Sequence, residues 1–164
     1  MEEDKLYLVK ILKDEQLDVC ELIDDEYISI NQLDCYQPDE VVVIEPDKEL
    51  YHKVWNFYGT EILIRIHFYH SNWIYLGAYT TEDESFCDIT VNLEDFAIGH
   101  VCNLGFINTN NCQKLDTWLV DNNLAVHTGT HRQPGFCSYP LMALNYTILY
   151  QLDPEAFSKA YFTY

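Results

Sequence analysis

The sequence is poor in positive charge. Its 164 residues include 9 Lys and Arg against 27 Asp and Glu, which gives a formal net charge of −18 and an isoelectric point near 4.3. Binding to phosphates requires Lys and Arg, so this balance argues against direct binding of nucleic acid and of anionic membrane surfaces. Three roles remain open for the excess of carboxylates: a basic protein partner, a cation site, or solubility alone.

Long apolar runs are missing too. No stretch approaches the roughly 18 apolar residues of a transmembrane helix, and residues 1–5 are acidic where a secretory signal is basic. We therefore expect an intracellular protein that makes no membrane contact and whose six Cys side chains are reduced. None of them forms a C-x-x-C pair, and several lie within apolar, strand-like runs, which is typical of buried thiols.

Motifs that carry enzyme chemistry are also missing. The sequence has neither a Gly-rich phosphate loop nor a Gly-x-Ser-x-Gly elbow. A metal-dependent nuclease needs clustered carboxylates with a Lys placed beside them. Residues 46–49 contain these residue types in a different order, and Glu94-Asp95 has no basic neighbour. We therefore predict that the protein is not an enzyme and has no catalytic residue.

The His and Cys residues do not show the spacing of a metal site. His67 and His70 are three positions apart, which places them on opposite faces of a strand. A discontinuous zinc site would need further ligands from distant positions, which are His100, Cys87, Cys102 and Cys112. We predict no metal and no cofactor.

One pairing of a nucleophile with a base remains as an alternative. Cys137 lies close to His131 in the sequence, and such a pair can act as nucleophile and base. No Asn or Asp upstream is marked as an orienting residue. Gly129 and Gly135 indicate a tight loop with positive φ angles, closed by a buried Phe136 and Cys137. We expect this loop to be structural.

The negative charge is distributed unevenly along the chain. Residues 1–50 contain 16 acidic residues and four Lys, a net charge of −12. The net charge is −5 over residues 51–100 and −1 over residues 101–164. The chain therefore has an acidic half and an almost neutral half, and this asymmetry needs an explanation more than the total does.

The hydrophobic pattern predicts mostly strands in the acidic region, which we take as residues 1–50. Residues 6–12 and 17–23 alternate as two strands of a β-hairpin around a polar break. A helix over 13–26 is the competing interpretation, because acidic residues also recur there at helical spacing. A short β-branched run at 41–44 precedes Pro46, which ends the strand or places it at a sheet edge.

Residues 51–164 are predicted to form an α+β domain. Strands over 62–69, 73–80 and 86–93, joined by short polar turns, form an antiparallel meander. Apolar spacing predicts a helix over 108–122 and a strand over 141–150. Asp153-Pro154-Glu155 is a strong start for a final helix. The predicted fold is α+β, with a central antiparallel sheet and C-terminal helices.

Several short motifs in this region resemble one bacterial family, the uncharacterised domain of unknown function 4313, over about residues 57–162. The motifs are Tyr58-Gly59-Thr60-Glu61, Val91-Asn92-Leu93, Phe106-Ile107-Asn108-Thr109-Asn110-Asn111, Thr128-Gly129, Gly135-Phe136-Cys137-Ser138-Tyr139-Pro140 and Leu152-Asp153-Pro154-Glu155. Pro134 stands where the family usually has Ser before the Gly-Phe-Cys motif. The resemblance implies a small protein of the kind often carried by phages, plasmids and conjugative elements of Gram-positive bacteria. It assigns no catalytic residues, and the acidic first 50 residues lie outside it.

The acidic half and the resemblance together lead to a functional prediction. We predict a cytoplasmic counter-defence protein of a phage or mobile element, an anti-CRISPR or anti-restriction inhibitor. It would bind the basic nucleic-acid channel of a host nuclease or nuclease–RNA complex through a DNA-mimic-like acidic surface. The predicted partner-binding residues are Asp14, Asp18, Glu21, Asp24, Asp25, Glu26, Glu45, Asp47, Glu49, Glu82, Asp83 and Glu84.

The spacing of charge limits how closely such a surface can copy DNA. If residues 45–49 are extended, Glu45, Asp47 and Glu49 lie on one side about 6.7 Å apart, whereas one DNA strand places a charge about every 3.4 Å. A single row is therefore too sparse, and two flanking rows come closer. The alternative function is a non-enzymatic interaction module of plasmid or phage maintenance that uses exposed Tyr and Trp. A small thiol enzyme centred on His131 and Cys137 is the third.

Overall fold

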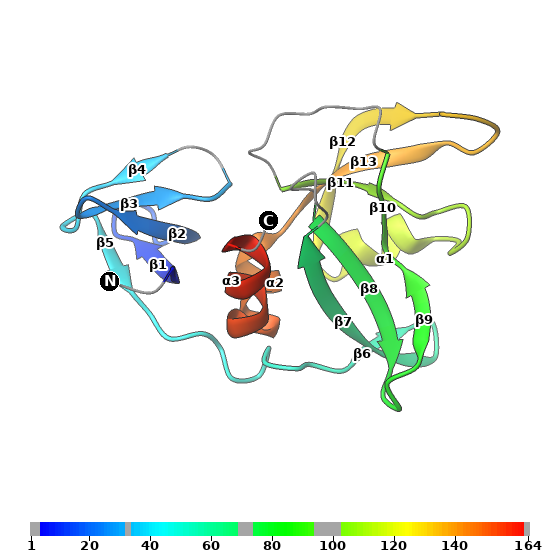
Figure 1. The fold of residues 1–164 in the computed structure, drawn as a ribbon, viewed down its shortest axis with the longest axis horizontal. Coiled ribbons are helices and arrows are strands. Elements are labelled where there is room, and N and C mark those ends of the chain that lie inside the picture. Colours follow the sequence, from blue (N-terminus) through cyan, green and yellow to red (C-terminus); the bar gives the residue numbers. More distant parts are fainter. Residues whose placement is uncertain (1–3, 32–33, 69–73, 94–102, 163–164) are drawn as a thin grey trace.

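The computed structural model describes residues 4–31, 34–68, 74–93 and 103–162. In these residues, three antiparallel sheets combine with three helices, two of which lie near the C-terminus (Figure 1). The predicted α+β class with antiparallel sheet and C-terminal helices is confirmed.

The acidic region folds into a five-stranded sheet. Its strands are β1 (Leu6–Ile11), β2 (Leu17–Ile23), β3 (Glu26–Ser29), β4 (Cys35–Tyr36) and β5 (Val41–Val43), in the order β4-β3-β2-β1-β5. The predicted hairpin is confirmed, since Leu8 of β1 pairs with Val19 of β2. The competing helix over 13–26 is wrong. The β-branched run at 41–44 forms the edge strand β5, as Pro46 indicates.

This sheet buries side chains on both faces. Such burial explains why residues 17–23 form a strand, as their alternating apolar pattern predicts, and not the helix that the spacing of the acidic residues suggested. Leu6, Leu8 and Val19 belong to the main core of the protein. The intervening Val9 and Cys20 point the other way and form a small second core with neighbouring Tyr side chains. Only an extended backbone places successive apolar residues in two separate cores.

The second sheet contains β6 (Trp55–Phe57), β7 (Thr60–Phe68), β8 (Ile74–Thr80) and β9 (Ser85–Asp88), paired in chain order. The predicted meander is confirmed, but its third strand ends at Asp88 instead of 93. The chain passes into the third sheet after Asp88. At this point the Thr90 hydroxyl contacts β8: it accepts a hydrogen bond from the Leu76 N–H and donates one to the Ile74 carbonyl. The sequence pattern missed β6, which joins β7 through a tight turn with positive φ at Tyr58 and Gly59.

The third sheet contains β10 (Thr90–Val91), β11 (Leu104–Ile107), β12 (Ala125–Arg132) and β13 (Tyr139–Leu144), in the order β10-β11-β13-β12. Helix α1 (Leu115–Asp121) precedes β12 and is shorter than the predicted 108–122. Residues 108–114, which the prediction placed at the start of this helix, lie outside regular secondary structure and are mostly turns. The Asn108 side chain donates a hydrogen bond to the carbonyl of Asp88. Tertiary bonds thus replace the first predicted turns of this helix.

The predicted strand over 141–150 is half right. Its first part is β13, but α2 (Tyr146–Leu152) begins where Asn145 caps the helix by accepting a hydrogen bond from the Ile148 N–H. The last helix, α3 (Pro154–Phe162), begins as predicted, with Asp153 Oδ1 accepting from the Ala156 N–H at 3.0 Å. None of the helices among the described residues has the length and apolar composition to cross a membrane.

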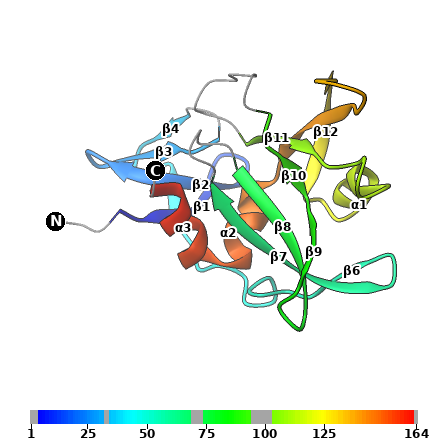
Figure 2. The same cartoon turned by 45° about the vertical axis from the view of Figure 1, so that its right-hand side comes forward.

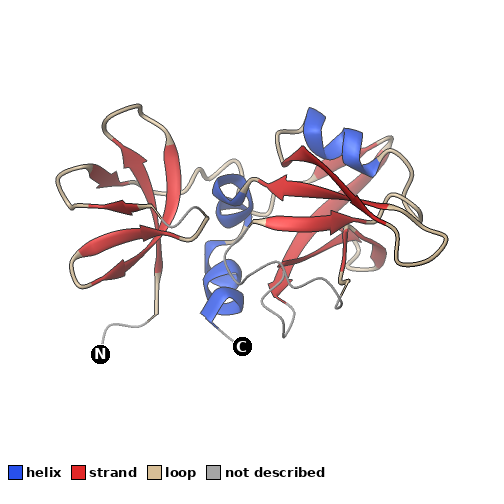
Figure 3. Ribbon diagram, turned by 90° about the horizontal axis from the view of Figure 1, so that it is seen from above, coloured by secondary structure: helices blue, strands red, loops and turns tan. Residues whose placement is uncertain are grey.

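Helices α2 and α3 lie between the β1–β5 sheet and the β6–β9 sheet (Figures 1, 2 and 3). The fully buried Phe157 of α3 packs against Phe68 of β7 and against Tyr146 and Tyr150 of α2. On the other side, the Tyr150 hydroxyl donates to the Leu6 carbonyl of β1 at 3.1 Å. The two helices therefore connect the acidic sheet to the rest of the core.

Candidate functional site

Carboxylates are concentrated on the β1–β5 sheet and the segment that follows it. Residues 4–31 and 34–49 contain 14 acidic residues and four Lys, a net charge of −10. Eleven of the acidic residues are exposed: Asp4, Asp14, Glu15, Asp24, Asp25, Asp34, Asp39, Glu40, Glu45, Asp47 and Glu49. We call these eleven residues the acidic face set; the name describes their composition and exposure.

Three of the predicted partner-binding residues of this sheet lie in turns at its two ends. Asp14 is in the β1–β2 turn, and Asp24 with Asp25 forms the β2–β3 turn. Asp24 and Asp25 have φ of 49° and 66°, a left-handed conformation that Asp tolerates better than most residues. Strand β2 has seven residues, so the two turns are about 20 Å apart.

Glu26 and Glu21 lie on the strands between the turns, where both are partly buried. Glu26 accepts hydrogen bonds from the Cys35 thiol and from Gln37 Nε2, and these bonds hold the pKa of Glu26 below its ordinary value. Burial, with a smaller contribution from Asp4, raises the pKa of Glu21. Both carboxylates are thus less available to a partner than those in the turns.

Asp18 is not a surface residue, and its assignment as a partner contact is wrong. It is 7% exposed, and it accepts hydrogen bonds from the Val19 N–H at 2.8 Å and the Tyr36 hydroxyl at 3.0 Å. Burial raises its pKa above the ordinary value, although these hydrogen bonds act in the opposite direction. Asp18 therefore links β2 to β4 inside the sheet.

The expected extended row of Glu45, Asp47 and Glu49 does not form. Asp47 starts a turn, in which its Oδ1 accepts from the Glu49 N–H at 2.9 Å and its carbonyl accepts from the Leu50 N–H. The Asp47 N–H donates to Gln151 Oε1 of α2 at 2.8 Å. The three side chains are exposed as expected, but the anchored turn removes the regular spacing of a strand.

Glu82, Asp83 and Glu84 lie apart from the other predicted residues. They form the exposed β8–β9 turn, which is on the far side of α2 and α3 from the β1–β5 sheet (Figure 1). Asp83 makes an ion pair with Arg65 of β7. The structure therefore does not bring these three residues together with the acidic face set.

The segment around Cys137 differs from the closed loop that was expected. Phe136 and Cys137 are exposed, Gly135 is not left-handed, and His131 belongs to strand β12, where it is opposite Pro140. Gly129 does have positive φ, at 85°, within the irregular part of the β12–β13 pairing. In the described residues no hydrogen bond or ion pair joins His131 to Cys137.

The side chains of Cys87 and Cys112 lie close together. Their sulfur atoms are 3.5 Å apart, and both thiols are free. Burial raises the pKa of Cys87 to about 12, with a smaller contribution from Cys112. Over residues 4–31, 34–68, 74–93 and 103–162, no group of three or more His, Cys, Asp or Glu side chains is placed to hold a metal. His70, His100 and Cys102 lie outside these residues.

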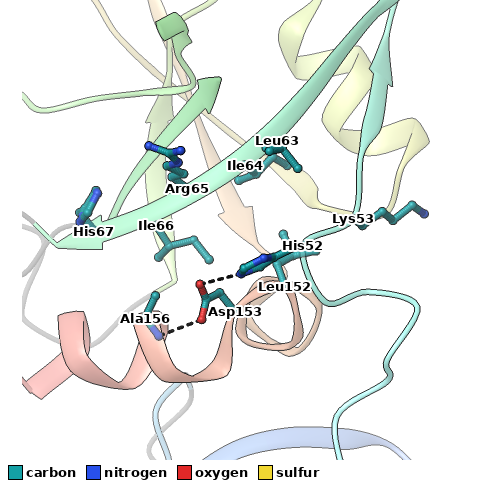
Figure 4. A pocket seen from close by; sticks show the side chains of 10 residues that line it. All are labelled: His52, Lys53, Leu63, Ile64, Arg65, Ile66, His67, Leu152, Asp153 and Ala156. Carbon is teal, nitrogen blue, oxygen red and sulfur yellow. Dashed lines mark hydrogen bonds and ion pairs between the residues drawn. The ribbon is translucent and has the colours of Figure 1, made fainter. Parts of the chain in front are cut away.

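A groove that the sequence did not reveal lies between β7 and α3 (Figure 4). It consists of a cavity of about 230 Å³ and an adjoining one of about 470 Å³, which share Ile66, His67 and Ala156. We call it the β7–α3 groove. Its other lining residues are His52, Lys53, Leu63, Ile64, Arg65, Phe68, Leu152, Asp153, Lys159 and Ala160.

Asp153 holds one wall of the β7–α3 groove in place. Its Oδ2 lies 3.1 Å from His52 Nε2, while its Oδ1 caps α3 (Figure 4). His52 is fixed further by its ring stacking on Tyr51, with the ring centres 4.0 Å apart, and by its backbone N–H, which donates a hydrogen bond to the Leu152 carbonyl. A His–Asp pair can move protons, but among the described residues that line the groove there is no Ser, Thr or Cys for the pair to activate.

The model of one protein family, described as Domain of unknown function (DUF4313), matches residues 63–162, which is more than half of the chain. The chain belongs to this family. No curated protein and no solved structure matches it. The DUF4313 segment begins within β7 and ends with α3, so it includes most of the β7–α3 groove. The β1–β5 sheet precedes it, and 17 of the 27 acidic residues come before residue 63.

Proposed function

We propose that this protein is a non-enzymatic counter-defence protein of a mobile element that acts in the bacterial cytoplasm. It binds the basic nucleic-acid channel of a host nuclease or nuclease–RNA complex and so excludes the nucleic acid. The observation that supports this proposal is the acidic face set: eleven exposed carboxylates on the β1–β5 sheet and the segment after it, outside the DUF4313 segment, in a stretch that contains four Lys.

The arrangement of these carboxylates favours competition by charge over a close copy of duplex DNA. The two turns at the ends of β2 are about 20 Å apart, which corresponds to about six phosphates of one strand. Of the acidic residues between these turns, Glu21 and Glu26 are partly buried, and Asp18 is buried and bonded to Tyr36 within the sheet. Turn carboxylates pair with Lys and Arg at the rim of a channel, and the net charge of −18 accelerates the encounter.

The test measures DNA cleavage by CRISPR effectors and restriction enzymes of the bacterial host, with and without the protein, at increasing salt. We expect inhibition that weakens with ionic strength. The triple substitution Asp14→Asn, Asp24→Asn, Asp25→Asn removes three charges of the turns, and Asn tolerates the left-handed backbone of Asp24 and Asp25. This variant is expected to need about tenfold more protein for half-inhibition.

The matched control removes three charges elsewhere: Glu61→Gln, Asp121→Asn and Glu155→Gln, all exposed. It is expected to inhibit like the wild type. Inhibition that depends neither on salt nor on the turn carboxylates would contradict the electrostatic proposal. Failure to inhibit any of these enzymes would contradict the nuclease target.

One observation favours the interaction module of plasmid or phage maintenance as a second candidate. Phe136 is fully exposed in the loop between β12 and β13. Exposed aromatic side chains often contribute strongly to protein interfaces. A pull-down with the wild type and with Phe136→Ser distinguishes the two candidates. Replication or conjugation proteins that bind only the wild type support the module, whereas nuclease subunits that bind both support the counter-defence proposal.

A further inference from the structure

Strand β7 has an outer edge that no other strand covers within the described residues. It has nine residues, but β6 pairs only with Thr60, Glu61 and Ile62. From Leu63 onward its one strand partner is β8. Uncovered strand edges present unpaired backbone groups to other chains.

The hydrogen-bond pattern identifies which backbone groups face outward. The Leu76 carbonyl of β8 accepts a hydrogen bond from the Ile89 N–H, so the backbone N–H and C=O groups of Leu76 face away from β7. Leu76 is opposite Ile66, whose backbone groups therefore make no hydrogen bond to β8. Because the bonding direction alternates along antiparallel strands, the backbone groups that bond to β8 are those of Leu63, Arg65 and His67. The N–H and C=O groups of the residues between them, Ile64 and Ile66, and of Phe68 then face the outer edge.

The β7–α3 groove runs along this edge. Five consecutive residues, 63–67, line its first cavity, and Phe68 continues along the second. Successive side chains of a strand point to opposite faces, so a cavity that contacts all of them lies beside the strand instead of over one face. The opposite wall is apolar and small, formed by Leu152 of α2 and by Ala156 and Ala160 of α3.

Basic side chains line the groove in a chain that has few of them. They are His52, Lys53, Arg65, His67 and Lys159. Asp153 is the one acidic residue in the lining, and it already contacts His52 and caps α3. Outside the lining, Asp83 of the β8–β9 turn pairs with Arg65, whose guanidinium has five N–H donors and so retains donors for a second carboxylate. The groove therefore differs in charge from the acidic face set.

We propose that the outer edge of β7 binds an extended acidic segment of a partner protein as an added strand. Backbone hydrogen bonds to Ile64, Ile66 and Phe68 provide affinity. The added strand places alternate side chains on the face of Arg65 and His67, where carboxylates suit the charge. The side chains between them lie against Ile66 and Ala156, where small apolar residues fit. The site is separate from the acidic face set, and its test is independent of nuclease inhibition.

The test measures binding of a fluorescently labelled peptide to the full chain by anisotropy at low salt. The probe is a capped seven-residue peptide of alternating Val and Glu, and the same peptide with Gln for Glu is the control, because a basic peptide would bind the acidic face set. We expect the Glu peptide to bind at least about tenfold more tightly than the Gln peptide. Equal binding of the two peptides, or no binding of the Glu peptide at millimolar protein, overturns the proposal.

A pair of charge variants assigns the binding to the groove. Lys53→Glu with Lys159→Glu changes one exposed residue in each of the two cavities, and we expect about a tenfold loss of affinity. Lys13→Glu with Lys48→Glu makes the same change of net charge at exposed positions outside the groove. We expect its effect to be less than about threefold. Equal effects of the two variants overturn the groove as the site.

N-methylation of the peptide tests the binding mode. Only alternate peptide N–H groups face β7 in an added strand, so methylation of one alternate set is expected to abolish binding while methylation of the other set preserves it. If both methylated peptides bind like the parent, strand addition is wrong. A dimer that forms without peptide and is lost in Lys53→Glu, Lys159→Glu assigns the edge to a second copy of this chain and likewise overturns the proposal.

Discussion

At the scale of single residues, burial decides what a carboxylate does. Asp18 lies within β2 and Asp14 in the turn before it, yet Asp18 is 7% exposed and bonded to Tyr36, whereas Asp14 is exposed. Because the charged form of Asp18 loses hydration, its pKa is raised. The same residue type therefore has a structural role at one position and a surface role four residues away.

The raised pKa of Asp18 predicts how stability changes with pH. The folded chain binds a proton at Asp18 more readily than the unfolded chain does. The contribution of Asp18 to stability is therefore greatest below its unfolded pKa, near 3.8, and decreases as pH rises through the folded pKa. Asp18→Asn removes this titration. We expect the free energy of unfolding of the wild type, relative to Asp18→Asn, to increase as pH falls from about 7 to about 4.5.

Urea denaturation at several pH values measures this difference. Asp39→Asn is the matched control, because Asp39 is exposed in the same region. The wild type relative to Asp39→Asn is expected to show little change over the same range. A difference for Asp18→Asn that is flat or of opposite sign would show that burial does not dominate at this carboxyl group.

The thiols provide a second test at this scale. Cys137 is exposed, whereas Cys112 is buried and Cys87 has a pKa raised to about 12. Since the thiolate is the reactive form, we expect an alkylating reagent to label Cys137 well before Cys87 or Cys112 in the native chain, as followed by peptide mass spectrometry. Cys137→Ser is expected to change the free energy of unfolding by less than about 0.5 kcal/mol. Loss of nuclease inhibition or of partner binding in this variant, with stability kept, would indicate a functional thiol.

At the scale of secondary-structure elements, short polar caps decide where the chain changes from strand to helix. Asn145 ends β13 and starts α2, and Asp153 separates α2 from α3. Asn145, a preferred N-cap residue, is a signal for the first of these changes within the apolar run from 141 to 150, and the prediction of a single strand did not use it. Asp153-Pro154 does carry a signal, and α3 begins as expected.

Two substitutions at Asp153 distinguish its role as the N-cap of α3 from its contact with His52. Asp153→Ala removes both and is expected to lower the free energy of unfolding by about 1 kcal/mol in urea denaturation. Asp153→Asn keeps an oxygen that accepts from the Ala156 N–H and should lose much less, because an exposed charge pair contributes little. Equal losses in the two variants would instead assign the stabilisation to the contact between Asp153 and His52.

At the scale of the whole molecule, one apolar core connects the acidic sheet with the DUF4313 segment. Leu6, Leu8 and Val19 share a cluster of buried residues with Phe157 and Leu149. This cluster opposes the repulsion among the exposed carboxylates of the same sheet. Burial in this shared cluster, together with the Tyr150–Leu6 hydrogen bond, thus holds the acidic sheet to the rest of the protein.

This shared core predicts that a substitution in the acidic sheet destabilises the entire chain. Leu8→Ala removes a side chain that is 2% exposed and is expected to cost about 2–5 kcal/mol. Trp fluorescence reports on Trp55 of β6 and Trp118 of α1, both outside the acidic sheet, and its urea midpoint should fall together with the loss of circular dichroism. Val43→Ala, on β5 of the same sheet and 47% exposed, is the control with little expected effect. Two separate transitions for Leu8→Ala would contradict a shared core.

Much of the local structure could be predicted because its signals lie within a few residues. The apolar patterns in 6–12, 17–23, 62–69 and 73–80 predicted strands that the structure confirms over the residues it describes, and Asp153-Pro154 predicted a helix start. The helix predicted over 108–122 begins only at Leu115, because Asn108 bonds to the Asp88 carbonyl, which is distant in the sequence. The uneven charge is also a property of the sequence alone, since it depends on composition and not on folding.

Local patterns predicted the α+β class and the meander, favoured the hairpin over a helix at 13–26, and separated an acidic from a nearly neutral half. Only the folded chain shows that Asp18 is buried, that residues 82–84 lie away from the other acids, and that β7 extends beyond β6 to leave an open edge beside α3. These outcomes depend on which distant segments pack together. Strand pairing, burial and grooves are set by contacts between residues far apart in the chain, for which a local pattern contains no signal.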